Sequence, residues 1–169
     1  MNGHIIATMI VLIIFLIATI WFARKKYKIN LSVLGLGAIA FFVSAQVLEK
    51  IVHLLVLRPQ KDGTIALMTE HPFLYVIYGI AMASLFEETA RFIFFKWLEK
   101  KRKLEVSDAL AYGLGHGGLE LLYVGIASLI NLFILFSAVQ SQNPKVLELL
   151  TENMLETIRT LAPWQVYLL

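Results

Sequence analysis

The sequence predicts an all-α membrane protein, a polytopic bundle of transmembrane helices. Hydrophobic residues make up 59% of the 169 residues and charged residues only 16%, against roughly 25% charged residues in an ordinary soluble domain. The mean hydropathy is +0.74, and a soluble fold of this length has no interior large enough to hide so much apolar surface. The apolar residues also gather into long runs, which is typical of membrane spans.

Four apolar runs predict four spans within a single membrane domain that covers residues 1–169. The first run is followed by the basic segment 24–28, and a cleaved signal peptide has its charge before the apolar core. The first run is therefore an uncleaved span. The expected spans are about 5–23, 31–57, 73–97 and 109–139, and Ser107 or Asp108 is the expected N-cap of the fourth.

Two further elements are expected after the fourth span. Residues 145–160 carry apolar residues at helical spacing, which predicts an amphipathic helix lying at the membrane interface. The aromatic and apolar run after Pro163 predicts the start of a further span.

The lysines and arginines predict how the chain lies in the cell membrane. Loop 24–30 holds four of them and loop 96–105 holds five, whereas loop 58–72 holds two. Because cytoplasmic loops carry an excess of Lys and Arg, the two rich loops are expected to be cytoplasmic. The N-terminus, loop 58–72 and helix 145–160 are then outside. The same pattern explains the net charge of +3, so the expected partner is the lipid bilayer and not a nucleic acid.

Two clusters of ionisable residues stand inside the third and fourth spans. The first holds Glu87, Glu88 and Arg91, and the second holds His116 and Glu120. Such groups cost at least about 2.5–3.5 kcal/mol each within a membrane span, so they face partners or water. Residues four apart share a helix face, which joins Glu87 to Arg91 and His116 to Glu120. Five such groups in consecutive spans predict one shared polar site.

The predicted depths of the two clusters match. Glu87 lies about 13 Å before Lys96 and His116 about 12 Å after Asp108, at 1.5 Å per helical residue. Because a short turn joins these spans, Glu87 and His116 can meet across one interface. Small residues allow helix backbones to approach closely, and the fourth span carries four of them near His116: Gly113, Gly115, Gly117 and Gly118.

These residue types suit general-base hydrolysis. A neutral His116 can share a water molecule with the carboxylate of Glu87 or Glu88, which is an arrangement for attack on an amide. Arg91 would keep that carboxylate ionised. Two carboxylates and a histidine are also an acceptable zinc set, but no second histidine stands at ligand spacing in the fourth span. We therefore expect no metal ligands and no cofactor, with zinc as the alternative. The chain has no cysteine, which excludes thiol catalysis.

Glu-Glu-x-x-Arg in one span, followed by Gly-His-Gly-Gly-x-Glu in the next, resembles the YhfC family. That family is similar to PrsW and to the CAAX-protease and bacteriocin-processing glutamate intramembrane proteases, and the resemblance covers all four spans. It implies an intramembrane endopeptidase acting on a membrane protein or peptide. The implied catalytic residues are Glu87, Glu88 and His116, supported by Arg91 and Glu120. Family members are often labelled metalloproteases, whereas the glutamate relatives imply catalysis without an essential metal, which we favour.

The sequence departs from the pattern of these relatives in one respect. The resemblance implies a further histidine in a later span, where it helps to stabilise the oxyanion, but no histidine follows His116. We therefore expect a chain truncated at its C-terminus. Loss of one oxyanion donor costs roughly 10²–10³ in rate, so activity is expected to be reduced or absent.

Other interpretations of the same residues remain open. Glu87 and Glu88 could be the ion sites of a small proton- or cation-coupled transporter, or the chain could be a non-catalytic protein that keeps the protease fold. Separately, Glu87 with Arg91 could be a neutralising ion pair that sets helix register.

Two pairs have purely structural interpretations. His116 with Glu120 could be a hydrogen-bonded pair and nothing more. Glu49 and His53, also four apart, are expected to lie at the interface near the outer end of the second span.

Overall fold

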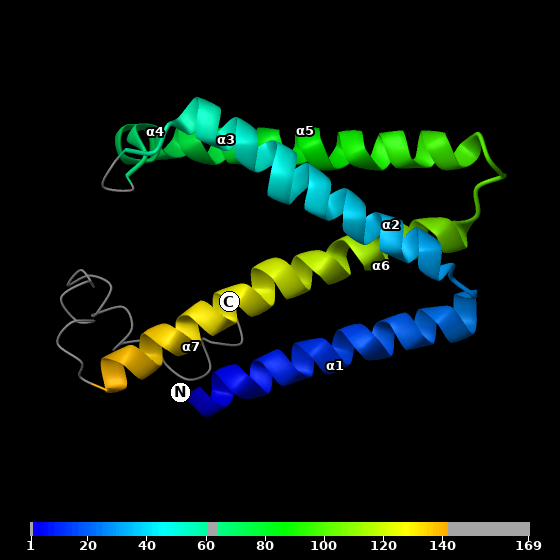
Figure 1. Cartoon of the computed structure of the whole chain (residues 1–169), viewed down its shortest axis with the longest axis horizontal. Helices are drawn as coiled ribbons and strands as arrows, with labels where there is room; N and C mark the ends of the chain where they lie inside the picture. Colours follow the sequence, from blue (N-terminus) through cyan, green and yellow to red (C-terminus); the bar gives the residue numbers. More distant parts are fainter. Residues whose placement is uncertain (1, 61–63, 142–169) are drawn as a thin grey trace. The chain divides into compact units, whose positions relative to one another are not determined.

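The computed structural model describes residues 2–60 and 64–141, and this part of the chain is helical with no strand. The predicted interfacial helix 145–160 and the expected start of a further span after Pro163 lie outside the described residues. The elements in chain order are α1 (Asn2–Tyr27), α2 (Leu31–Phe41), the π-helical η1 (Phe42–Glu49), α3 (Lys50–Leu57), α4 (Ala66–Glu70), α5 (Pro72–Glu99), α6 (Val106–Glu120), the π-helical η2 (Leu121–Ile126) and α7 (Ala127–Gln140) (Figure 1).

Four continuous helices are long and apolar enough to cross a membrane. They cover Asn2–Tyr27, Leu31–Leu57, Pro72–Glu99 and Val106–Gln140. The second and fourth pass through η1 and η2 without leaving helical geometry. The predicted fold class, an all-α membrane bundle with four candidate spans, is confirmed.

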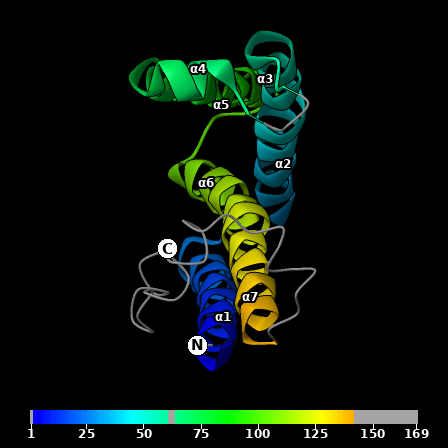
Figure 2. The same cartoon turned by 90° about the vertical axis from the view of Figure 1, so that its left-hand side faces the viewer.

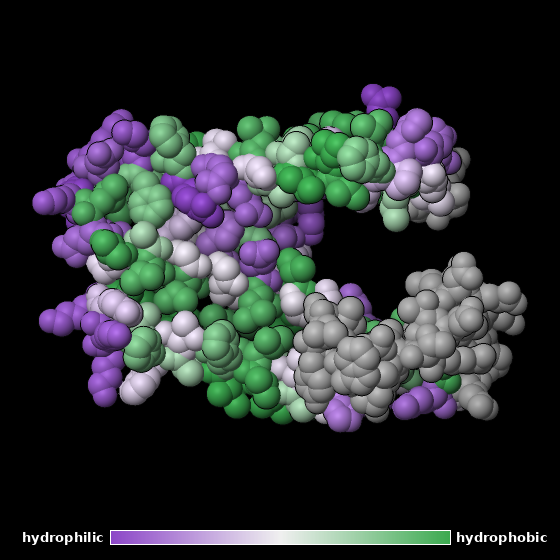
Figure 3. Space-filling view, turned by 180° about the vertical axis from the view of Figure 1, so that it is seen from behind, coloured by the Kyte–Doolittle hydropathy of each residue, from purple (hydrophilic) through white to green (hydrophobic). Residues whose placement is uncertain are grey.

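The outer faces of these helices are apolar. Large side chains stay open to the surroundings, among them Phe15 at 65%, Leu55 at 68% and Phe73 at 74% exposure. Figure 3 shows apolar residues over much of the visible surface. A soluble protein rarely exposes apolar patches of this extent, so these faces are suited to lipid.

The start of α6 is set by Asp108, whose side chain is buried. The helix begins at Val106, so neither Ser107 nor Asp108 is its N-cap, and that prediction is wrong. Asp108 instead reaches back to accept the backbone N–H of Glu105 at 2.9 Å, because an acidic side chain at the third helical position can satisfy the N-cap donor. The Arg102 guanidinium donates to both Asp108 oxygens, and this hydrogen bonding raises the pKa of Arg102 above its ordinary value.

The chain divides into two compact units. The described part of the first combines residues 2–22 with residues 121–141. In its described part, Ile5 of α1 packs with Leu129 and Phe136 of α7, and the Asn2 amide donates to the Ser137 hydroxyl at 3.0 Å.

The second unit, residues 23–120, contains every residue of the predicted site. Its core joins α2, α5 and α6 with the end of α1, through Ala23, Ile29, Val33, Phe94, Leu98, Ala111 and Tyr112. Because Ile29 belongs to loop 24–30 and Leu98 to segment 96–105, the two basic loops lie at the same end of this unit.

The closest helix packing in the second unit is between α2 and α6. The two helices lie against each other where they cross (Figures 1 and 2). A Cβ atom at Gly115 would overlap the carbonyl oxygen of Leu34, and one at Gly37 would overlap the carbonyl oxygen of Tyr112. The sequence suggested glycine contacts between the third and fourth spans. The close approach is to the second span instead, because Gly37 of α2 supplies the matching small residue.

Candidate active site

Glu87 of α5 and His116 of α6 meet within the second unit. Nε2 of His116 lies 3.5 Å from Oε2 of Glu87, and the two side chains are 8% and 28% exposed. This separation is at the limit of hydrogen bonding, and among the described residues neither ring nitrogen of His116 has a hydrogen-bond partner. The imidazole is therefore buried beside a carboxylate, and both its nitrogens have unused hydrogen-bonding capacity within the described residues.

Aromatic side chains hold the His116 ring in place. Phe41 of α2 packs edge-on against it, with ring centroids 5.2 Å apart. Tyr112, one turn earlier on α6, lies at 5.9 Å and stacks on Phe94 of α5 at 4.8 Å. Sequence reasoning missed both neighbours. Tyr112 could have been found from its spacing, because residues four apart share a helix face. Phe41 could not, because it comes from another span and has no local signal in the sequence.

Of the two carboxylates expected to pair with Arg91, the structure selects Glu88 and not Glu87. Arg91 donates to Glu88 at 2.7 Å, with side chains 45% and 63% exposed, so the suggested Glu87–Arg91 ion pair is replaced by a Glu88–Arg91 pair. The physical reason is that Glu87 turns toward α6. An ion pair inside a span needs water or further protein around it.

Glu120 does not join this group. Its side chain is exposed, whereas His116 is buried. Since the His116 nitrogens make no hydrogen bond within the described part of the chain, the suggested His116–Glu120 hydrogen bond is wrong. Glu120 ends α6, where η2 begins, while the His116 ring faces Phe41 and Tyr112.

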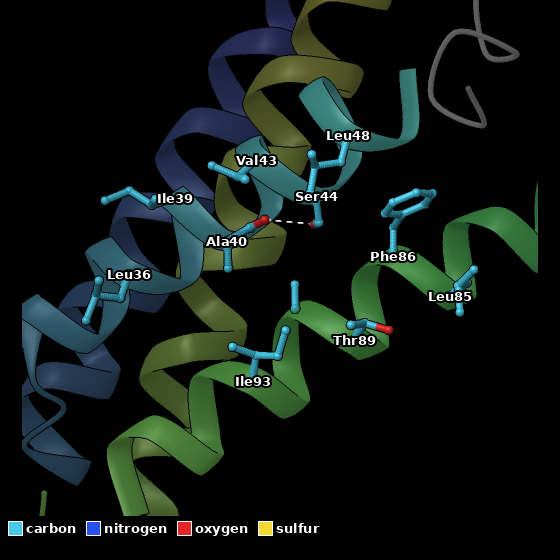
Figure 4. A pocket seen from close by; sticks show the side chains of 11 residues that line it. Leu36, Ile39, Ala40, Val43, Ser44, Leu48, Leu85, Phe86, Thr89 and Ile93 are labelled. Atoms are coloured by element: carbon cyan, nitrogen blue, oxygen red, sulfur yellow. Dashed lines mark hydrogen bonds between the residues drawn. The ribbon is translucent and has the colours of Figure 1, made fainter. Parts of the chain in front are cut away.

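An apolar groove of about 570 Å³ runs between α2 with η1 and α5. Figure 4 shows side chains from both walls pointing into it. The Ser44 hydroxyl donates to the Ala40 carbonyl at 2.7 Å, and the other hydroxyl of the lining belongs to Thr89 of α5. Glu87 and His116 do not line this groove, although Phe86 and Ala90 of its α5 wall are the residues one before and three after Glu87 in the sequence. The lining residues are Leu36, Ile39, Ala40, Val43, Ser44, Leu48, Leu85, Phe86, Thr89, Ala90 and Ile93.

A second polar group joins α3 to α5. Nε2 of His53 lies 3.1 Å from the Glu49 carboxylate, and its Nδ1 lies 3.1 Å from the Tyr78 hydroxyl. Glu49 is only 8% exposed, so it is buried between helices and not placed openly at an interface as expected. Both His53 nitrogens are hydrogen-bonded, which indicates a structural role.

Replacing Tyr78 with phenylalanine should therefore destabilise the protein. The Tyr78→Phe change removes one hydrogen bond and leaves the half-buried His53 nitrogen unpaired, at an expected loss of about 0.5–1.5 kcal/mol. Thermal unfolding in detergent measures this, with Tyr75→Phe on the same helix as the matched control. Equal melting temperatures for the two variants would show that the Tyr78 bond contributes nothing.

The described residues do not form a complete zinc site. Within 2–60 and 64–141, no three His, Asp or Glu side chains come together as a metal-binding group. A catalytic zinc takes three protein ligands, and Glu87 with His116 supplies two at most.

Comparison with known proteins identifies the family. A family model described as YhfC intramembrane metalloprotease matches residues 8–169. Over 122 residues the chain is 41% identical to a Bacillus subtilis (strain 168) protein named uncharacterized membrane protein YhfC, a match that covers 72% of this chain and 46% of that relative. The chain thus spans less than half of the relative's length, and no solved structure matches it. Because the family model covers nearly the whole sequence, it confirms the resemblance, and the chain belongs to the YhfC intramembrane metalloprotease family.

Proposed function

We propose that this protein is an intramembrane endopeptidase in which Glu87 activates water for peptide-bond hydrolysis. The observation that carries the proposal is the 3.5 Å approach of Glu87 to His116, deep within two candidate spans. Ionisable groups at such depth are expensive and mark functional sites. A carboxylate beside a histidine that makes no hydrogen bond within the described residues is suited to hold and deprotonate one water molecule.

The proposed reaction uses Glu87 twice. As the water oxygen bonds to the carbonyl carbon, the Glu87 carboxylate accepts a water proton. When the carbon–nitrogen bond breaks, Glu87 returns that proton to the departing amine. A neutral His116, held by Phe41 and Tyr112, hydrogen-bonds the same water and orients it. Glu88 acts with Arg91 as a charged pair beside Glu87, and Glu120 keeps the supporting assignment that its motif implies.

The proposed substrate is an apolar polypeptide segment within the bilayer. The groove between α2 with η1 and α5 has a volume of about 570 Å³ and almost only apolar walls. Ligand sites generally have volumes of about 300–1,000 Å³, so the groove is large enough for several side chains of such a segment. The exposed apolar faces favour lipid as the surrounding partner, and nothing in this site suits a nucleic acid.

The proposed mechanism takes no step through a metal. The family description names a metalloprotease, but a third protein ligand does not join Glu87 and His116 among the described residues. The Glu87–His116 pair alone can perform the proton transfers written above.

We propose the orientation that the loop charges predict. Loops 24–30 and 96–105 lie at the same end of their unit, and together they carry nine Lys and Arg residues. That end is assigned to the cytoplasm by the positive-inside rule. The N-terminus and loop 58–72 are then outside.

A proton- or cation-coupled carrier is less well supported. Carriers typically bind their ions where a spanning helix is broken and unwound. The candidate spans in the described part of the chain remain helical throughout. Their π-helical segments, η1 and η2, are of the kind often found at functional sites but leave no unwound backbone.

Hydrolysis of single-span peptides tests the function. The full chain would be reconstituted in liposomes with a set of quenched fluorescent peptides, each a Leu/Ala-rich span with a Gly-Ser pair at a different depth. In ¹⁸O-labelled water we expect one ¹⁸O atom in the new carboxylate, and we expect cleavage to persist after treatment with a zinc chelator. Cleavage that is lost on chelation and restored by zinc would contradict the glutamate mechanism. Ion flux without cleavage would favour the carrier.

A further inference from the structure

The Tyr112 hydroxyl is a buried donor with no hydrogen-bond partner in the described part of the chain. The residue is 2% exposed, and its ring packs against Phe94, Phe95 and His116 with centroids 4.8 to 5.9 Å away. Phenylalanine would make the same ring contacts. A buried unpaired hydroxyl costs free energy relative to phenylalanine, so packing alone does not account for tyrosine at this position.

This hydroxyl belongs to the surroundings of the Glu87–His116 pair. The Tyr112 ring packs against the His116 ring, with centroids 5.9 Å apart, and against Phe94 and Phe95 of α5. On α6 it comes from the residue one turn before His116, whose nitrogens are also unpaired within the described residues. The side chains of Tyr112 and His116 thus both contact α5, through Phe94 and Glu87.

Peptide hydrolysis requires a donor that the pair itself lacks. As water attacks, negative charge develops on the carbonyl oxygen, and preorganised donors aimed at that oxygen stabilise the transition state. An ionised Glu87 only accepts hydrogen bonds, and His116 is occupied with the water in the proposed mechanism. Two other hydroxyls of this unit are already bonded, since Ser44 donates to Ala40 and Tyr78 is bonded to His53.

Building on the proposed function, we infer that Tyr112 is a further catalytic residue, whose hydroxyl donates a hydrogen bond to the carbonyl oxygen of the peptide bond being cleaved. The phenol keeps its proton throughout, and no covalent bond to Tyr112 forms or breaks. The hydroxyl stabilises the oxyanion of the tetrahedral intermediate, while Glu87 and His116 manage the water. The ligand that satisfies this buried donor is therefore a substrate carbonyl.

The Tyr112→Phe variant tests the inference against Tyr78→Phe, which also removes one tyrosine hydroxyl from the same unit. With the quenched single-span peptides, we expect Tyr112→Phe to lower kcat by roughly 10²–10³ with little change in KM. Its melting temperature should equal or exceed that of the natural protein. Tyr78→Phe should show the opposite, with nearly natural kcat and a lower melting temperature.

Several results would overturn the inference. A natural kcat in Tyr112→Phe would exclude the donor role, and a lowered melting temperature in that variant would mean that the hydroxyl has a structural partner. The Glu87→Gln variant separates the two proposals. If it retains cleavage, the proposed function fails. If it is inactive while Tyr112→Phe cleaves normally, only the Tyr112 assignment fails.

A binding measurement does not depend on turnover. Single-span peptides ending in an aldehyde form a hydrate that resembles the tetrahedral intermediate, and such analogues bind more tightly than ground-state ligands. The natural protein should prefer the aldehyde to the matching alcohol, and Tyr112→Phe should lose that preference. If the natural protein and Tyr112→Phe prefer the aldehyde over the alcohol to the same degree, the inference is contradicted.

Discussion

Replacing Glu87 with glutamine is expected to reduce kcat for peptide hydrolysis by at least about 10²–10⁴-fold, the usual contribution of a general base. Glutamine has the shape of glutamate but cannot accept the water proton. Glu87 makes no short hydrogen bond to His116, so the Glu87→Gln variant should insert and melt like the natural protein. Single-turnover cleavage of the quenched peptides in liposomes measures the loss, and circular dichroism checks the helix content.

Glu99→Gln provides the matched control. Glu99 ends the same helix and forms an exposed ion pair with Lys96 at 3.1 Å, so this change removes one carboxylate from α5 far from His116. Its cleavage rate should be nearly natural. A Glu87→Gln variant as active as Glu99→Gln would remove Glu87 from the mechanism.

The second large effect is expected at Gly115. A methyl group there would overlap the Leu34 carbonyl oxygen, and because both groups are on helix backbones, α2 and α6 would have to separate. Overpacking of this kind typically costs about 1–3 kcal/mol, occasionally more. Gly115→Ala should therefore lower the melting temperature in detergent. It should also reduce cleavage, since His116 is the next residue and packs against Phe41 of α2.

Gly113→Ala on the same helix is the control. Nothing lies within 4 Å of a Cβ atom at Gly113, and alanine is favoured over glycine in a helix by roughly 1 kcal/mol. This variant should be as stable as the natural protein or more so. If Gly115→Ala and Gly113→Ala melt alike, α2 and α6 do not touch at Gly115.

Much of the architecture was predictable from local properties of the chain. A bilayer requires about 20 consecutive apolar residues and internal hydrogen bonding within each span. Composition and hydropathy therefore determine the all-α class and the four candidate spans without any knowledge of packing. The same constraint makes Glu87, Glu88, Arg91 and His116 conspicuous, because ionisable residues rarely occur within such segments.

The sequence by itself determined that two ionisable clusters lie at similar depth in consecutive spans. The tertiary structure alone decided how their members pair, with Glu87 beside His116 and Arg91 with Glu88. It also decided that Gly37 and Gly115 join α2 to α6, and that Phe41 and Tyr112 enclose His116. The physical reason is that helical periodicity specifies which residues share a face of one helix, whereas the choice among partners depends on side-chain rotamers and on packing between spans distant in sequence.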